Sequence, residues 1–380
     1  MTTTINNEQK KLNVPNLRFK EFQGEWEEKR LSEIAELYKG NGISKEQLSD
    51  RGEPCILYGE LYTKYKSEVI SEVVSKTDID TKKLVRSKAN DVIIPCSGET
   101  AEDIATARCV PYDNILLGGD LNIIRLHDTE GSFMSYQLNG KRKYDIAKVA
   151  QGVSVVHLYG EHLKGVKTYV PCVEEQKKIA RLLSLLDERI ATQSKVIDKL
   201  QSLIKGIAHR ISKQDKSNIR LSECLQCSSS TLQESDVAEV GSYPVYGANG
   251  VVGYLDTYNT TDEAIYIIKD GSGVGSVSYI NGKCSATGTL NILQAKDGFS
   301  LRYLYFMLKV FSFEPYKTGM AIPHIYFKDY GKAKIFCPPY ELQNKYADLL
   351  SKIEQKAIAE QKILDNLCSQ KQYLLRQMFI

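Results

Sequence analysis

The stretch Gly152-Val-Ser-Val-Val-His157-Leu-Tyr159 occurs again, about 167 positions later, as Gly319-Met-Ala-Ile-Pro-His324-Ile-Tyr326. The match continues without a gap into the sequence that follows. Identical pairs are Lys167 and Lys334, Pro171 and Pro338, Glu174 and Glu341, Gln176 and Gln343, Ala180 and Ala347, Leu182 and Leu349, Leu183 and Leu350, and Ser184 and Ser351. Similarity at a fixed spacing indicates an internal repeat.

The repeat also extends toward the N-terminus of each copy. Gly119-Asp-Leu-Asn-Ile123 matches Gly288-Thr-Leu-Asn-Ile292, and Arg30-Leu-Ser-Glu33 matches Arg220-Leu-Ser-Glu223. The spacing changes between these two matches, so the first copy carries roughly 21 additional residues between Glu33 and Leu121, which a loop can accommodate. The repeating unit is therefore a globular domain followed by a long helix, used twice.

Each copy ends in a segment with a seven-residue apolar rhythm. Such spacing, with charged residues on the other faces, predicts a coiled-coil seam. The first seam is Leu183, Leu186, Ile190, Ile197, Leu200, Ile204, Ile207 and Ile211, interrupted by Gln193. The second is Leu350, Ile353, Ala357, Leu364, Leu367, Leu374 and Met378, interrupted by Glu360 and Lys371. Pro171, Pro338 and Pro339 stand just before the helices, where a missing N–H costs least.

The order of the parts predicts how the two helices pair. The first helix leads from the first domain to the second, and the other begins beyond the second domain. If their seams bury each other, the helices are antiparallel and the domains lie at opposite ends. Leu183 to Ile211 then spans about 42 Å, close to one turn of duplex DNA at roughly 34–36 Å. Pairing of these helices with another chain remains an alternative.

The two globular units lack helical periodicity over most of their length. Short β-rich runs, Asp91-Val-Ile-Ile, Leu121-Asn-Ile-Ile, Ala264-Ile-Tyr-Ile-Ile and Thr289-Leu-Asn-Ile-Leu, lie between turn residues and predict strands. We expect an α+β protein with two mainly β domains of similar fold, joined by two long antiparallel helices with internal pseudo-twofold symmetry. The expected segments are an N-terminal tail over 1–16, domain one over 17–150, the first helical region over 151–217, domain two over 218–335 and the second helical region over 336–380.

Tyrosine, lysine and asparagine gather in the expected strand connections. Lys can neutralise phosphates, whereas Tyr and Asn can stack on bases or read their edges, although tyrosine on a β surface more often only packs. The candidate DNA contacts are Tyr58, Tyr62, Lys64, Tyr65 and Lys66 in the first domain, and Tyr243, Tyr246, Asn249 and Tyr254, beside Tyr258, in the second.

Composition sets broad limits. The chain of 380 residues is 42% hydrophobic and 26% charged, enough for two buried cores. The start, Met1 to Lys11, lacks the apolar core of a signal peptide, and Leu301 to Phe313 is too short to span a bilayer, so we expect a cytoplasmic protein. Nine cysteines favour reduced, mostly buried thiols. The net charge of +3 neither requires nor excludes a nucleic-acid partner.

Several fragments of catalytic motifs are incomplete, and we expect no catalytic site and no metal site. Cys337-Pro-Pro-Tyr340 superficially resembles the adenine methyltransferase loop, but cysteine cannot supply the carbonyl acceptor. Gly271-Ser-Gly-Val-Gly275 lacks the following Gly-Lys-Ser/Thr of a P-loop. Cys224 and Cys227 lack a second metal-binding pair, and His157 and His324 suggest a structural turn.

The chain resembles the specificity subunits of type I restriction-modification systems over nearly its whole length. The resemblance rests on the opening Val14-Pro15 to Trp26 with Arg30-Leu-Ser-Glu-Ile-Ala, on the repeated Gly-x4-His-x-Tyr, and on Glu-x-Gln-Lys-Lys-Ile-Ala from Glu174 with its variant from Glu341. Phe327-Lys-Asp-Tyr departs from the more usual polar start. Lys371 and Glu360 depart from an apolar seam, which predicts a looser helix pair.

The resemblance implies a non-catalytic subunit whose two target-recognition domains each read one half of an asymmetric bipartite DNA site. It implies that the helices set the spacing, that two modification subunits dock beside them to methylate adenine, and that restriction subunits can join. No cofactor is expected on this chain, with S-adenosylmethionine, ATP and Mg on the partners and no membrane contact. Two alternatives remain open, a self-sufficient DNA adenine methyltransferase and a coiled-coil adaptor that does not bind DNA.

Overall fold

The computed structural model describes residues 12–152 and 154–380. Residues 1–11, with most of the expected N-terminal tail and the segment considered as a signal peptide, lie outside this range, as does Val153 in the repeated motif. The chain forms two compact units. Unit 1 consists of the chain up to Thr192 together with Ile363–Ile380, and unit 2 consists of Gln193–Lys362.

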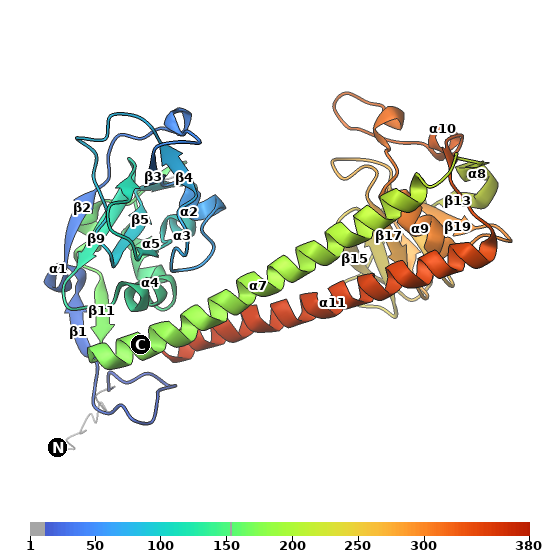
Figure 1. Ribbon diagram of the computed structural model, residues 1–380. Coiled ribbons are helices and arrows are strands. Elements are labelled where there is room, and N and C mark those ends of the chain that lie inside the picture. Colours follow the sequence, from blue (N-terminus) through green and yellow to red (C-terminus); the bar gives the residue numbers. More distant parts are fainter. Residues whose placement is uncertain (1–11, 153) are drawn as a thin grey trace, which may run out of the picture. The chain divides into compact units, whose positions relative to one another are not determined.

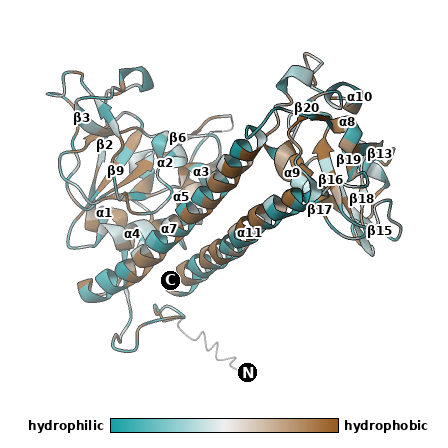
Figure 2. Cartoon of the chain, turned by 45° about the vertical axis from the view of Figure 1, so that its right-hand side comes forward, coloured by the Kyte–Doolittle hydropathy of each residue, from teal (hydrophilic) through white to brown (hydrophobic). Residues whose placement is uncertain are grey.

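The long helices are continuous, and both units share them. Helix α7 covers Val173–Ser212 and helix α11 covers Tyr340–Gln377, each unbroken in Figure 1. Each begins one or two residues after the prolines at 171 and 338–339, as the sequence predicts. Hydrophobic and hydrophilic residues alternate along both helices (Figure 2), as helices with one buried face require.

Unit 1 contains a four-stranded antiparallel sheet in the order β2-β9-β5-β7. Its strands are Ala35–Lys39, Leu121–Leu126, Asp91–Pro95 and Arg108–Val110. A three-stranded sheet, β4-β3-β8, comprises Ser75–Thr77, Glu53–Ile56 and Leu116–Leu117. Two small pairs complete it, β1 (Glu27–Arg30) with β11 (Lys167–Val170) and β6 (Ser97–Gly98) with β10 (Val156–His157).

Short helices cover and connect these sheets. In unit 1 they are α1 (Leu31–Ile34), α2 (Glu60–Thr63), α3 (Ala101–Ile104), α4 (Gly131–Asn139), α5 (Lys143–Val149) and α6 (Gly160–Leu163).

Unit 2 repeats the topology of unit 1. Its four-stranded sheet runs β13-β19-β16-β17, over Leu225–Ser229, Leu290–Ala295, Ala264–Ile268 and Val277–Ile280. Its three-stranded sheet runs β15-β14-β18, over Gly250–Leu255, Tyr243–Gly247 and Ser285–Ala286. Unit 2 also contains β12 (Ile219–Arg220) paired with β20 (Lys334–Ile335), α8 (Leu221–Cys224), α9 (Leu301–Lys309), α10 (Phe327–Tyr330) and the 3-10 helices Glu234–Asp236 and Glu314–Tyr316.

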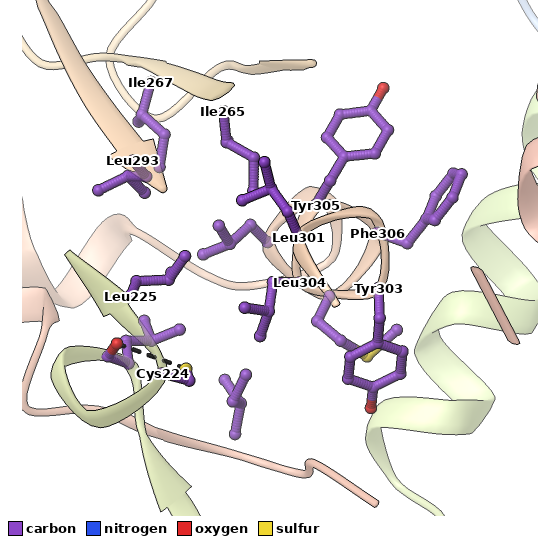
Figure 3. Close-up of a cluster of buried hydrophobic side chains, with 14 of the residues drawn as sticks. Cys224, Leu225, Ile265, Ile267, Leu293, Leu301, Tyr303, Leu304, Tyr305 and Phe306 are labelled. Atoms are coloured by element: carbon purple, nitrogen blue, oxygen red, sulfur yellow. Dashed lines mark hydrogen bonds between the residues drawn. The ribbon is translucent and has the colours of Figure 1, made fainter. Parts of the chain in front are cut away.

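The four β-rich runs quoted from the sequence form β5, β9, β16 and β19, the paired central strands of the two larger sheets. Helix α9 packs on the second of these sheets, and Figure 3 shows Leu301 and Leu304 facing Leu225, Ile265 and Leu293. The prediction of two mainly β domains of similar fold joined by two long helices is confirmed.

The two units differ mainly in one connection. In unit 1 the chain between β3 and β4 runs through residues 57–74 and contains α2. In unit 2 the equivalent strands β14 and β15 are joined by residues 248–249 alone. Most of the additional residues expected in the first copy therefore lie in the segment that holds its lysine and tyrosine candidates.

Candidate nucleic-acid interface and helix seam

The long helices pair within each unit. In unit 1, Ile179, Ala180 and Leu183 at the start of α7 share a buried cluster with Met378 and Phe379 at the end of α11. In unit 2, Ile204, Ala208 and Ile211 at the end of α7 share a cluster with Ala347 and Leu350 near the start of α11. The start of each helix meets the end of the other, so the pairing is antiparallel.

All predicted seam positions are buried or half-buried. Leu183, Ile197, Ile204, Ile211, Leu350, Leu367 and Met378 are buried. Leu186, Ile190, Leu200, Ile207, Ile353, Leu364 and Leu374 are half-buried. The polar interruptions find partners as well, since Gln193 donates hydrogen bonds from Nε2 to the backbone oxygen of Glu360, at 3.0 Å, and to its carboxylate.

A repeated polar contact joins each globular part to its long helix. In unit 1 the Tyr136 hydroxyl on α4 donates to Asp187 on α7 at 2.7 Å. In unit 2 the Tyr305 hydroxyl on α9 donates to Glu354 on α11, also at 2.7 Å. Burial raises the pKa of both phenols, so they remain donors.

Gln176 and Gln343, which are identical in the two copies of the repeat, make the same hydrogen bonds. Gln176 donates from Nε2 to the oxygen of Pro171 and accepts from the N–H of Glu130. Gln343 donates to the oxygen of Pro338 and accepts from the N–H of Ser300. Both glutamines are buried, so each one ties the first turn of a long helix to the globular part of its unit.

The candidates of unit 1 lie on and beside α2, in unequal environments. Tyr58 is exposed, and Lys66 is exposed with its Nζ donating to the oxygen of Tyr62. Lys64 is bound to Glu60 and to the Ser75 hydroxyl, both at 2.7 Å. Tyr65 is buried among Ile56, Leu61 and Ile70, so its interpretation as a surface contact is corrected. The ring lies in the core because the chain turns inward just after the end of α2, at Tyr65.

A cleft of about 700 Å³ opens beside α2. Tyr58 and Tyr62 line it, together with Arg108, Ser97 and Val155 of the repeated motif. Tyr62 donates to the oxygen of Ser97 at 3.0 Å, and burial lowers the pKa of Arg108. The sequence analysis did not select Arg108 because it lies in a separate strand, β7, and only the sheet brings it to α2.

The candidates of unit 2 lie on the hairpin β14-β15. Tyr254 and Asn249 are exposed, whereas Tyr243 and Tyr246 are half-buried. The Tyr243 and Tyr258 rings meet edge to face at 4.9 Å, and Lys283 Nζ lies 4.8 Å from the Tyr258 ring. Lys283 is a cation that the sequence analysis missed, since it follows β17 and is distant in sequence from the tyrosines.

The other motifs have structural roles or none that the geometry shows. His157 and His324 each pair by backbone hydrogen bonds with the start of their hairpin, at Gln151 and Thr318. Cys224 is buried and Cys227 is half-buried. In the described part of the chain, no group of three or more His, Cys, Asp or Glu residues is placed to hold a metal ion.

One model of a protein family matches most of the chain. The model is described as the type I restriction modification DNA specificity domain, and it matches residues 23–202 and 214–368. None of the described helices combines the length and the apolar character that crossing a bilayer requires.

Similar proteins are named as type I specificity subunits. A putative type I specificity subunit from Mycoplasma genitalium is 24% identical over 68% of this chain and 73% of its own length. One from Mycoplasma pneumoniae is 31% identical over 30% of this chain and 40% of its length. The Escherichia coli EcoprrI specificity subunit is 26% identical over 30% of this chain and 28% of its length, so two of these three matches span less than half of the relative.

Solved structures share the fold. The crystal structure of the type I restriction-modification system S subunit from M. genitalium has a TM-score of 0.66 at 20% identity, covering 97% of this chain and 99% of that one. A chain from a study of complex assembly and conformational transition of the type I R-M system has a TM-score of 0.53 at 16% identity, covering 93% and 97%.

Proposed function

Because the chain belongs to the family of type I restriction-modification DNA specificity subunits, we propose that it selects an asymmetric, bipartite DNA site and positions partner subunits that methylate adenine and cleave DNA. It acts as a recognition subunit and binds no cofactor itself. S-adenosylmethionine, ATP and Mg belong to the partners, and the complex works in the cytoplasm.

The observation that carries this proposal is that the two units share one topology but differ in a strand connection at the surface. The sheets and the helix anchors are equivalent in the two units, whereas the long β3-β4 connection of unit 1 is replaced in unit 2 by the two residues 248–249. Sequence is read by side chains that reach base edges, and these come from such connections. Two unlike reading surfaces on one framework favour two unlike half-sites.

Exposed apolar residues on the long helices support two copies of one partner. Val173 and Tyr340, Leu182 and Leu349, and Val196 and Ile363 occupy equivalent positions in the repeat, and all six are exposed. Packing within the chain does not explain exposed apolar side chains that recur in both copies. Two modification subunits, one on each copy of the repeat, would bury them.

The spacing of the half-sites tests the proposal. Removal of seven residues, 190–196, from α7 together with the matching heptad 357–363 of α11 shortens the pair by about 10 Å. We expect the preferred spacer to shorten by about three base pairs, measured by footprinting with modification subunits on targets of graded spacer. The same change in one helix only is the control, and it should disrupt pairing instead.

Three results would contradict the proposed function. An unchanged spacer preference in the shortened protein would remove the spacing role of the helices. Absence of any sequence-selective footprint for the wild-type complex would favour an adaptor, and saturable binding of S-adenosylmethionine to the isolated chain by calorimetry would favour a methyltransferase.

A further inference from the structure

Three charged side chains from separate parts of unit 1 meet in its interior. Lys371 on α11 contacts the carboxylate of Glu68, and its Nζ lies 2.6 Å from Asp187 on α7. The side chains of Lys371, Glu68 and Asp187 are 15%, 9% and 9% exposed. We call these three residues the Lys371 cluster. It joins the globular part, α7 and α11 at one point.

The Lys371 cluster interrupts the apolar seam, as the Gln193 and Glu360 pair does, and its charges are compensated. Burial opposes the charge of Lys371, but the attraction of Glu68 and Asp187 prevails and raises its pKa. Asp187 also accepts from Tyr136, and Arg108 lies close enough to interact with both carboxylates. Lys371 and Glu360 interrupt the apolar pattern of the second seam, and both have partners. Lys371 pairs with Glu68 and Asp187, and Glu360 accepts from Gln193.

Unit 2 is built differently at the equivalent place. Glu354 corresponds to Asp187 and Tyr305 to Tyr136. The cations at Glu354, however, are Arg302 and Lys309, and both lie on α9 of the globular part. The repeat places Ile204 where unit 1 has Lys371. The Lys371–Asp187 ion pair of unit 1 connects the two long helices, whereas the ion pairs of Glu354 in unit 2 connect α11 to α9.

Ionic contacts add selectivity that the apolar seam lacks. A heptad seam offers similar apolar surfaces one repeat along, so burial alone distinguishes poorly between neighbouring alignments. A shift by one heptad along α7 would place Lys371 beside Ala180 or Ser194 in place of Asp187. That shift would separate the buried Lys371 cation from both of its carboxylates, which is strongly unfavourable.

We propose that Lys371 is a positioning residue, which fixes α11 against both α7 and the globular part of unit 1 and so restricts the spacer lengths that the protein accepts. The inference rests on the proposed function, because it assigns a spacing role to a contact between the helices. It concerns the alignment of the helices and not the reading of bases.

The test removes the three charges of the Lys371 cluster together, and Arg108 keeps its hydrogen bonds to the backbone oxygens of Tyr65 and Ala107. The triple variant Glu68→Gln, Asp187→Asn and Lys371→Met keeps side-chain size, and Tyr136 can still donate to residue 187. Arg302→Met, which removes a cation from Glu354 without touching a contact between the long helices, is the matched control. Lys371→Arg, which keeps the charge, is the rescue variant.

Two measurements are made on the full chain. Footprinting with modification subunits on a spacer series should show at least a tenfold preference for one length in the wild type, Arg302→Met and Lys371→Arg, and a preference at least threefold weaker in the triple variant with the half-sites unchanged. Pulsed electron spin resonance between labels at Cys368 and Ala191→Cys, with Cys172→Ser, should show a distance distribution that broadens only in the triple variant.

Retained spacer selectivity in a folded triple variant would overturn the inference while leaving the proposed function intact. A wild-type complex with no spacer preference would instead contradict the proposed function. Equal broadening in Arg302→Met would also overturn the inference, because it would show that any lost ion pair loosens the helices.

Discussion

At the scale of single residues, the two units make the same hydrogen bond with different acceptor residues. A tyrosine hydroxyl meets an aspartate in unit 1 and a glutamate in unit 2, each at 2.7 Å. A neutral donor to a buried carboxylate satisfies both groups, and removal of either leaves the other desolvated. Hydrogen bonding therefore explains why both units keep a tyrosine and a carboxylate at this place.

The lysines beside α2 should contribute unequally to DNA binding. Lys66 is exposed and its Nζ donates to the backbone oxygen of Tyr62, whereas Lys64 is already paired with Glu60. We expect Lys66→Ala to weaken binding equally for cognate and unrelated sequences and to reduce the salt slope by about 1. Lys64→Ala should change the slope less, as measured by Kd at several salt concentrations. An altered sequence preference in Lys66→Ala would contradict a phosphate contact.

Glu53 should make stability depend on acidity. Hydrogen bonds from Arg86 and Thr81 lower the pKa of Glu53 from 4.5 to about 2. A lowered carboxyl pKa stabilises the fold above pH 4.5, and this contribution is lost as the pH falls toward 2. We expect the difference in Tm between the wild type and Glu53→Gln to shrink from pH 6 to pH 3. A difference that is constant over that range would show that the ion pair is not formed in solution.

At the scale of elements, the long helices carry both buried and exposed apolar residues. The seam face is buried within the chain, and the apolar residues that come one position before a seam residue, Leu182, Val196, Leu349 and Ile363, remain exposed beside it. Neighbouring residues in sequence fall on different faces because a helix advances by about 100° per residue. Adjacent leucines can therefore be compared directly, at positions 182 and 183 and again at 349 and 350.

Substitution of the buried leucines should lower stability, and substitution of the exposed leucines should weaken assembly with the partner. Leu350→Ala and Leu183→Ala should each lower the free energy of unfolding by about 2–5 kcal/mol, because both side chains are fully buried. Leu349→Ala and Leu182→Ala should change it by less than about 0.5 kcal/mol but weaken binding of modification subunits. Urea unfolding and analytical ultracentrifugation with the partner measure the two effects. Unchanged assembly in the Leu182 and Leu349 variants would remove these leucines from the partner surface.

At the scale of the whole molecule, the end of α11 completes a unit that begins some 350 residues earlier in the sequence. Met378 and Phe379 belong to the buried cluster of Trp26 and Phe133, with the Trp26 and Phe379 rings 6.3 Å apart. Unit 1 therefore includes segments from both ends of the described chain, and its stability depends on the pairing of the helices.

Deletion of residues 363–380 should destabilise unit 1 selectively. Trp26 is the one tryptophan of the sequence and is fully buried, so its fluorescence reports on unit 1 alone. We expect the emission to shift to the red and its melting transition to move to lower temperature, since the Trp26 cluster loses Met378 and Phe379. Phe379→Ala should act in the same direction, and Tyr373→Ala, at an exposed position, should not. Unchanged emission after the deletion would show that unit 1 does not need α11.

The internal repeat, the antiparallel seam and the central strands of both units follow from the sequence alone. These features depend on periodic burial and on short-range signals such as Pro171 before α7, and such signals lie within a few residues of each other. The tertiary structure decided which candidates reach the surface and which charges are paired. Tyr65 is buried, Lys64 is neutralised, and Lys371 meets Glu68 across 303 positions of sequence. A periodicity assigns a residue to a face of its own element, whereas the partner on that face is set by the topology that packs distant segments together.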